Sequence, residues 1–280
     1  MSYKALPPVL VALLADHPRN APPPEALARL AGVSDFAVEV LVQQPGLLAG
    51  LNEPLQSLQL RADAESEWPV RIRRWRRAQS LKLIWRDVAG IDSVEQTLAG
   101  STWIAEQALQ AGFTAIDTLL RQSHGTVRDE HGAEQHMTVL GLGKLGGGEL
   151  NFSSDVDLIY FYNSDRGKTT GVNDPVRGLR NQISIHQYFV KLSELISKAI
   201  GQATEDGFVF RVDLRLRPEG NSGEMANSIA AGEIYYESWG QSWERSAMLK
   251  ARPVAGSKRL GEELLQRLQP FIYRRHLDYA

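Results

Sequence analysis

Cysteine is absent from the 280 residues, which excludes a disulfide scaffold, a thiolate zinc site, an iron–sulfur cluster and a cysteine nucleophile. A chain without cysteine suits a reducing compartment, so we expect a cytoplasmic protein. An excess of one charge is also lacking, since 31 Lys and Arg face 33 Asp and Glu, for a net charge of -2. A nearly neutral chain has no global attraction for polyanions, and we therefore expect neither a nucleic-acid nor a membrane partner.

Long apolar runs are missing too. The opening segment, residues 1–20, is too short and too interrupted by proline to span a bilayer. It also lacks the charged start and the small-residue cleavage site of a signal peptide. The chain is long enough for one large domain or two ordinary ones, and its 43% hydrophobic residues suffice for a sizeable core.

The first part of the chain has the periodicity of helices. Apolar residues recur three and four positions apart in 25–51, and Ser34 stands where an N-cap belongs, before the second of two short runs. From residue 65 to residue 120 the pattern stays helical, with single glycines as punctuation. We predict an all-helical N-terminal region over residues 1–122.

Strand patterns begin near residue 125, after a polar connector. β-Branched and aromatic runs predict strands, the segment 163–181 holds almost nothing to bury and predicts a mobile surface loop, and amphipathic runs predict helices. The predicted strands are 137–144, 155–162 and 208–218, and the predicted helices are 185–202, 230–252 and a closing helix in 261–280. Strands interleaved with helices after an all-helical start predict an α+β fold with a mixed sheet.

A glycine-rich segment follows the first of these strands. Gly141, Gly143 and Gly146 spell the dinucleotide-binding pattern GxGxxG, but the next predicted strand begins at Asp155, and the segment 145–154 before it is too short for a crossover helix. A Walker A loop is excluded as well, because Gly147 stands where lysine is required. Two interpretations remain: a short helical turn whose N–H groups and Lys144 face a phosphate, or a tight turn that needs glycine for its backbone angles.

Two aspartates stand one residue apart in the second strand. Because side chains alternate along a strand, Asp155 and Asp157 point to one face, with Cα atoms about 6.7 Å apart. Carboxylates so placed can share hard cations that phosphate oxygens bridge. The alternative is a solvated strand end with two exposed acids.

The third predicted strand decides between these alternatives. In 208–218 apolar residues alternate with Arg211, Asp213, Arg215 and Arg217, so that three arginines surround one acid on the polar face. Guanidinium groups bind phosphate in a bidentate manner, and arginines beside a cation-binding acid therefore suit a phosphate-bearing ligand. A surface ladder of ion pairs is the competing interpretation, but the glycine turn and the acids together favour a catalytic site.

These residues carry a resemblance. The segment 141–162, a glycine turn followed some ten residues later by the two aspartates, resembles the signature of polymerase-β-like nucleotidyltransferases. Longer stretches resemble the glutamine synthetase adenylyltransferase/adenylyl-removing family, bifunctional enzymes that add AMP to glutamine synthetase and remove it. They are 33–51, 141–159, 206–223, 243–252 and 270–279, and they span nearly the whole chain.

The resemblance is to the N-terminal, adenylyl-removing half of that enzyme. Arg211 stands where the adenylylating half tends to carry an acid, and 243–252 (WERSAMLKAR) is also similar to the first half. This implies a piece of a longer protein, with a nucleotidyltransferase domain over 123–255 and the start of a C-terminal helical segment over 256–280.

The resemblance further implies a reaction and its partners. Phosphate attacks the AMP on a tyrosine of adenylylated glutamine synthetase and ADP leaves; ATP-dependent adenylyl transfer is the alternative activity. Mg²⁺ is implied on Asp155, Asp157 and Asp213, and the nitrogen-signalling protein PII and glutamine are implied as regulators. Binding of phosphate or nucleotide is implied for the following residues: Gly143, Lys144, Gly146, Ser153, Ser154, Arg215 and Arg217. A purely regulatory module that binds PII or glutamine has no need of three such acids.

One basic segment stands apart from this site. Residues 71–77 contain five arginines around Trp75. On a helix these arginines spread over much of the circumference, so we expect a solvated or ion-paired helix. A docking surface for glutamine synthetase is the next interpretation.

Overall fold

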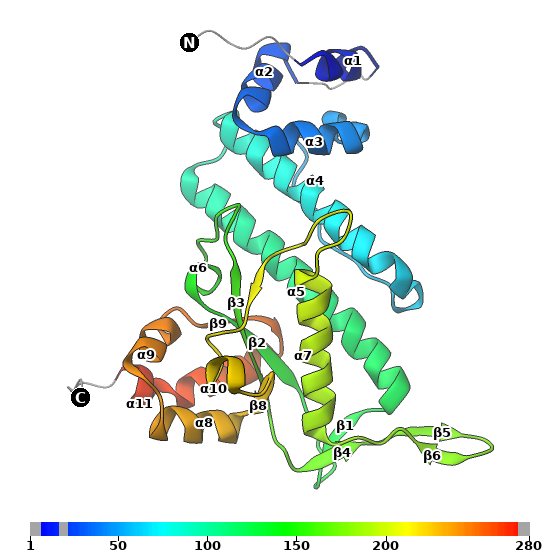
Figure 1. Cartoon of the computed structure of the whole chain (residues 1–280), viewed down its shortest axis with the longest axis vertical. Coiled ribbons are helices and arrows are strands. Elements are labelled where there is room, and N and C mark those ends of the chain that lie inside the picture. Colours follow the sequence, from blue (N-terminus) through cyan, green and yellow to red (C-terminus); the bar gives the residue numbers. More distant parts are fainter. Residues whose placement is uncertain (1–6, 17–21, 274–280) are drawn as a thin grey trace.

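The first part of the chain is helical in the computed structural model, which describes residues 7–16 and 22–273 (Figure 1). The predicted N-cap is confirmed, because the Ser34 hydroxyl accepts a hydrogen bond of 3.1 Å from the amide of Ala37. The predicted all-helical character of the described N-terminal residues is confirmed as well. The elements are α1 (Pro8–Asp16), α2 (Pro24–Val33), α3 (Asp35–Gln43), the 3₁₀ helices η1 (Pro45–Gly50) and η2 (Ala62–Glu67), α4 (Trp68–Val88) and α5 (Val94–His124).

A mixed five-stranded sheet forms the centre of the rest, which confirms the predicted α+β class. Strand β2 (Met137–Gly141) lies antiparallel between β3 (Val156–Tyr162) and β9 (Arg252–Gly256). Two short strands, β7 (Val212–Asp213) and β8 (Ala226–Ser228), both pair parallel with β3, at its opposite ends. Asp157 and Asp213 therefore lie on adjacent strands, and Asp155 directly precedes β3.

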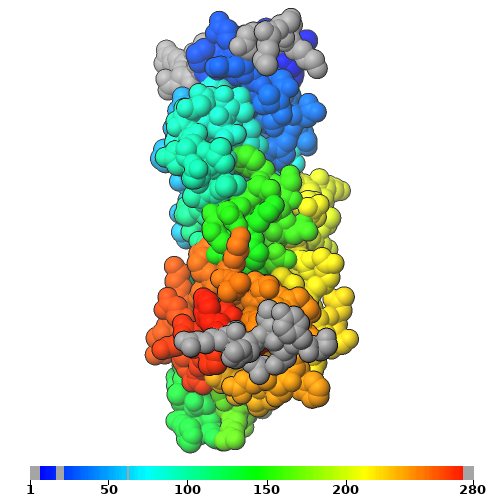
Figure 2. Space-filling model, turned by 90° about the vertical axis from the view of Figure 1, so that its left-hand side faces the viewer, coloured from blue at the N-terminus to red at the C-terminus, as the bar shows by residue number. Residues whose placement is uncertain are grey.

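Helices cover both faces of this sheet (Figure 1). Helices α5 and α7 (Ile185–Gly201) pack on one face, in a hydrophobic cluster that reaches back to α4. On the other face lie α8 (Ile229–Ser238), α9 (Ser242–Met248), α10 (Lys258–Arg267) and α11 (Gln269–Ile272). A third cluster joins α1–α3 and η1 to α4 through Leu81 and Trp85. The molecule is elongated, with α1–α3 at one end (Figure 2).

Four sequence predictions need correction. Segment 163–181 is a folded arm, in which β4 (Gly167–Thr169) pairs with β1 (Val127–Asp129), and β5 (Val172–Asp174) pairs with β6 (Gly178–Arg180). The predicted strand 208–218 is reduced to β7, and the predicted helix 230–252 breaks between α8 and α9 and ends before β9. The closing helix is two helices, α10 and α11, and residues 274–280 of its predicted range lie outside the described residues.

Among the five arginines of 71–77, Arg71 and Arg74 are exposed and Arg77 is ion-paired, as expected, whereas Arg73 departs from the expectation. Arg73 is only 2% exposed, and its guanidinium donates to the carbonyl oxygens of Pro69 (2.8 Å), Gly207 (2.7 Å) and Gln202. It thereby ties α4 to the C-terminal end of α7 and the loop that follows. Burial lowers the pKa of Arg73, and the nearby Asp206 opposes this shift.

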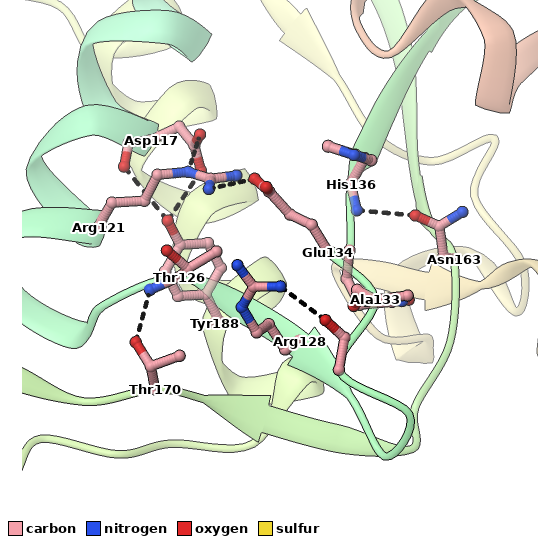
Figure 3. A network of polar contacts seen from close by, with 12 residues as sticks. Asp117, Arg121, Thr126, Arg128, Ala133, Glu134, His136, Asn163, Thr170 and Tyr188 are labelled. Carbon is pink, nitrogen blue, oxygen red and sulfur yellow. Dashed lines mark hydrogen bonds and ion pairs between the residues drawn. The ribbon is translucent and has the colours of Figure 1, made fainter.

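A polar network fixes α5 and α7 to the connector before β2 (Figure 3). Asp117 accepts hydrogen bonds from the Tyr188 hydroxyl at 2.8 Å and from Arg121 at 2.7 Å, and Arg121 also donates to Glu134 at 2.5 Å. Burial, followed by the charge of Asp117, raises the pKa of Tyr188. The network lies near β1, away from the glycine turn of 143–146, and its contacts are those of a structural brace (Figure 1).

None of the helices formed by residues 7–16 and 22–273 combines the length and the apolar character that a membrane span requires.

Candidate active site

The glycine turn and the two aspartate-bearing strands meet at one end of the sheet. Strand β2 leads through Leu142 directly into the single helical turn α6 (Gly143–Gly146). The amide of Leu142 donates to the carbonyl oxygen of Asp157 at 3.0 Å, which places the start of β3 beside the turn. Asp213 of β7 is the register partner of Asp157 across the parallel pair. Asp157 thus lies between the turn and Asp213.

Glycine is required twice in this turn, for different reasons. Gly143 has φ +53°, and a Cβ there would lie 2.7 Å from Oδ2 of Asp157. A Cβ on Gly146 would collide with the carbonyl oxygens of Gly141 and Lys250. The first glycine therefore lets the backbone approach a carboxylate, and the second lets the turn pack against the segment before β9.

Asp157 is the central acid of the site. It is half-buried, and burial raises the pKa of its carboxyl, followed by the negative charges of Asp213 and Asp155. Among the hydrogen bonds of the described residues, none reaches the Asp157 carboxylate. A half-buried carboxylate with two neighbouring acids and no donor is an arrangement that a hard cation stabilises.

Arginines neutralise the two outer acids. The Arg211 guanidinium donates to Asp155 at 2.5 Å and to the carbonyl oxygen of Ser153 at 2.9 Å. Arg215 binds both oxygens of Asp213, with its Nε at 2.9 Å and 3.1 Å from them, and these hydrogen bonds hold the pKa of Asp213 below its usual range. The outer acids are thus paired with guanidinium groups that also suit phosphate.

The donor set fits a divalent cation in kind, since it consists of carboxylate oxygens around Asp157. As they stand, however, the side chains of residues 7–16 and 22–273 include no group of three or more His, Asp or Glu arranged to hold a metal ion. The reason is visible in the ion pairs, because Asp155 and Asp213 face their arginines. Coordination by all three acids requires these two carboxylates to turn from Arg211 and Arg215.

The predicted phosphate-binding residues differ in their location and contacts. Lys144 is exposed on the glycine turn; the pKa of the nearby Glu149 is lowered mainly by its hydrogen bond with Lys250, and the charge of Lys144 adds to this shift. Ser153 and Ser154 lie on the loop before β3, where the Ser154 hydroxyl donates to Asn151 at 2.5 Å. All three are close to the acids in the chain, and their roles remain predictions.

Arg217 is held differently from Arg211 and Arg215. Its guanidinium donates to the carbonyl oxygens of Leu214 (2.9 Å), Gly223 (3.1 Å) and Asn221 (3.2 Å). It thereby closes the loop between β7 and β8. A contact with phosphate would have to replace these hydrogen bonds, so the proposed binding role of Arg217 stays a prediction.

One residue at the site has no counterpart in the sequence prediction. Arg252, the first residue of β9, donates to the carbonyl oxygens of Leu145 and Gly146, each at 3.2 Å, and pairs with Glu106 of α5 at 2.5 Å. It therefore holds the C-terminal end of the glycine turn against α5. The sequence gives little sign of this role, because β9 contains Pro253 and lacks the alternating pattern that would predict a strand.

A glycine turn after one strand, two acids at the start of the antiparallel neighbour and a third acid on a parallel strand define a nucleotidyltransferase-like α+β fold. The family model for glutamate-ammonia ligase adenylyltransferase matches residues 25–267. The chain belongs to this family.

Relatives with this chemistry in their names support the assignment. The bifunctional glutamine synthetase adenylyltransferase/adenylyl-removing enzyme of Stenotrophomonas maltophilia (strain R551-3) is 49% identical over 258 residues, 91% of this chain and 27% of the relative. The proteins of the same name from Xanthomonas campestris pv. campestris (strain B100) and Thioalkalivibrio sulfidiphilus are 46% and 39% identical, over 94% and 92% of this chain and 28% and 27% of theirs. The chain thus spans about a quarter of the length of these relatives.

Proposed function

We propose that this chain carries the adenylyl-removing activity on glutamine synthetase. In this reaction an oxygen of inorganic phosphate attacks the phosphorus of the tyrosine-bound AMP. The bond from that phosphorus to the tyrosine oxygen breaks, the tyrosine oxygen takes the proton that phosphate gives up, and ADP leaves. The observation that carries the proposal is the position of Asp157 between two further acids and the glycine turn.

The residues of the site have separate parts in this proposal. Asp155, Asp157 and Asp213 would hold Mg²⁺, which when bound neutralises charge that builds up on the phosphoryl oxygens. Arg211 and Arg215 exchange their carboxylate partners for phosphate oxygens as the acids turn to the cation. The amides of the glycine turn and Lys144 bind and orient the anionic substrate, and Ser153 and Ser154 donate to it.

The choice of half rests on sequence features around the site. Arg211 directly precedes β7 and pairs with Asp155, at the position where the adenylylating half tends to carry an acid. A second cation beside the acids favours a second anionic reactant, as phosphorolysis requires. We further propose that PII and glutamine regulate the longer protein and that it acts in the cytoplasm.

The test is an assay of the purified chain with adenylylated glutamine synthetase, Mg²⁺ and phosphate. Phosphate-dependent release of ADP that disappears in Asp157→Asn is the expected result. The matched control is Asp165→Asn, which changes an acid beyond the other end of β3 and is expected to retain ADP release. Transfer of AMP from ATP to unmodified glutamine synthetase, with no ADP release, would reverse the choice of activity.

A further inference from the structure

A large cleft lies between the N-terminal helices and the catalytic core. Its volume is about 1230 Å³, and its walls come from α2, the start of α3, α4, and the loops that precede β3 and β7. In Figure 1 the loop before β7, drawn in yellow, rises toward α3 and α4. The volume suffices for a ligand of nucleotide size. The charged residues lining the cleft are Arg29, Arg76, Arg77, Arg211, Asp87 and Asp206.

The guanidinium of Arg76, in this cleft, has few hydrogen-bond partners and no ion-pair partner among the described residues. Its guanidinium lies 5.6 Å from the ring centre of Phe36 and 5.4 Å from that of Phe210. Its one hydrogen bond is a long one of 3.5 Å to the carbonyl oxygen of Phe152, and its buried Nε has no acceptor. Within the described ranges 7–16 and 22–273, no carboxylate forms an ion pair with it. A desolvated cation without a counter-ion is a costly arrangement that a bound anion relieves.

Four arginines and two aspartates line the cleft, so positive charges outnumber negative ones among its lining residues. Arg77 pairs with the exposed Glu39 at 2.8 Å, while its own buried Nε lacks an acceptor. The two acids of the cleft are engaged elsewhere: Asp87 accepts from Thr97 at 3.1 Å, and Asp206 interacts with Arg73. Burial lowers the pKa of Arg76 to about 10, so this guanidinium still carries its charge at neutral pH.

Aromatic surface accompanies these charges. The Arg76 guanidinium lies over the rings of Phe36 and Phe210, and Phe208, which also lines the cleft, is 44% exposed. An exposed phenyl ring offers a stacking surface to a flat base, and the Arg76 guanidinium offers donors to phosphate. The two features together match a nucleoside phosphate better than an inorganic anion.

We propose that this cleft is a second ligand site, adjacent to the acids around Asp157, that binds a nucleoside phosphate with its phosphate on Arg76. The cleft also touches the catalytic site, because Arg211 and Ser153 line it and Arg211 holds Asp155. A phosphate in the cleft therefore competes with Asp155 for Arg211.

The test measures equilibrium binding of ADP to the whole chain by calorimetry in the presence of EDTA, which suppresses metal-dependent binding at the acids. Arg76→Met keeps the apolar contacts of the side chain with both rings and is expected to weaken ADP binding about tenfold or more, the usual effect of losing a charge-assisted hydrogen bond. The matched control is Arg71→Met, an exposed arginine of the same helix outside the cleft, which is expected to bind as the original chain does.

A second variant blocks the cleft and leaves Arg76 in place. A Cβ on Gly32, which lines the cleft, would meet nothing within 4 Å, so Gly32→Tyr adds a ring there without a backbone clash. This variant is expected to lose ADP binding, whereas Gly46→Tyr, equally unobstructed and outside the cleft, retains it. Asp155→Asn releases Arg211 and is expected to tighten ADP binding, a gain that misfolding does not produce.

Three results would overturn the proposal: no ADP binding in EDTA, binding that Arg76→Met and Gly32→Tyr leave unchanged, or inorganic phosphate binding as tightly as ADP. Adenosine is expected to bind more weakly than ADP, since it lacks the phosphate that Arg76 binds in this proposal. None of these measurements uses the phosphorolysis assay, so the proposed activity and the second site stand or fall separately.

Discussion

At the scale of single residues, Asp157 combines a chemical function with a cost to folding. Burial and the charges of Asp213 and Asp155 raise the pKa of its carboxyl. The folded protein therefore binds the Asp157 proton more tightly than the unfolded chain does. The free energy of unfolding therefore falls as the pH rises from the pKa of Asp157 in the unfolded chain to its higher pKa in the folded protein. Over this range the carboxyl ionises in the unfolded chain, whereas in the folded protein these charges oppose its ionisation.

We expect Asp157→Asn to abolish activity and yet to stabilise the fold at neutral pH without added metal. The gain is on the order of 0.5 to 1 kcal/mol, the usual scale for charges that are only partly buried. Urea unfolding of both proteins from acid to neutral pH would measure it. The difference should vanish at the acid end of the range, and equal stability at neutral pH would show that Asp157 is not under repulsion.

Alanine substitutions at Gly143 and Gly148 distinguish the effect of backbone strain from the effect of crowding the site. Both have positive φ, +53° and +73°, but only at Gly143 would a Cβ approach Asp157, at 2.7 Å. Gly143→Ala is therefore expected to cost about 1 to 2 kcal/mol and most of the activity. Gly148→Ala, where a Cβ meets nothing within 4 Å, is expected to cost about 1 kcal/mol and to retain activity.

Thermal unfolding and the ADP-release assay on the two variants provide the comparison. Equal losses of activity would mean that backbone strain alone matters and that the approach of Gly143 to Asp157 has no catalytic role.

At the scale of elements, one buried polar side chain of α4, Arg73, adds hydrogen bonds to the apolar packing that holds this helix to the catalytic core. The Arg73 guanidinium donates hydrogen bonds to the carbonyl oxygens of Pro69, Gln202 and Gly207. We expect Arg73→Met to lower the free energy of unfolding by about 2 to 4 kcal/mol, because buried carbonyl groups lose their donor. Arg74→Met, an exposed neighbour on α4, is expected to change it by less than about 0.5 kcal/mol.

Urea unfolding of both variants would measure these changes: the midpoint concentration should shift while the dependence of the free energy of unfolding on urea stays the same. Similar midpoints for Arg73→Met and the original chain would mean that α4 is held to the core by apolar packing alone.

The sequence predicts some elements well and others poorly, for physical reasons. Strand β3 and helix α7 have long, uninterrupted apolar patterns, so their existence and approximate bounds follow from periodicity. The 208–218 segment has an equally regular alternation, yet only Val212 and Asp213 pair with β3. Alternation does not show where a neighbouring strand ends, and here the loop closed by Arg217 takes the chain away from the sheet.

Strand β9 and the folded arm 163–181 do not follow from the sequence pattern, for another reason. The strand includes Pro253 and follows a helical segment directly, and its pairing with β2 is a long-range contact that no local pattern encodes. The arm is polar, but its backbone groups are satisfied by β1 and by the β5–β6 pair rather than by water alone. The sequence places the acids on two predicted strands, and Asp157 and Asp213 are register partners in the structure, whereas the pairing of Asp155 and Asp213 with Arg211 and Arg215 depends on side-chain geometry.

At the scale of the whole molecule, the hydrophobic clusters differ in how they are attached. The cluster of α1–α3 reaches α4 through Leu81 and Trp85, whereas Leu83, two residues further on, belongs to the central cluster. Each of these leucines is at most 2% exposed. We expect Leu81→Ala and Leu83→Ala to cost similar amounts, about 2 to 5 kcal/mol each, but to loosen different parts of the chain.

Hydrogen exchange followed by mass spectrometry would show the difference. Leu81→Ala should speed exchange in residues 24–51 and leave 137–162 protected, and Leu83→Ala should affect the second range more. Uniform acceleration in both variants would mean that the chain unfolds as one cooperative unit.

The elongated outline in Figure 2 bears on how the protein behaves in solution. Its accessible surface is 15043 Å², whereas about 12,000 Å² is expected for a compact monomer of 31.1 kDa. A particle of this shape diffuses more slowly than a sphere of the same mass and elutes early from a sizing column. Retention volume alone would therefore suggest a dimer where one chain is present, and mass measured by light scattering or sedimentation equilibrium gives the reliable count.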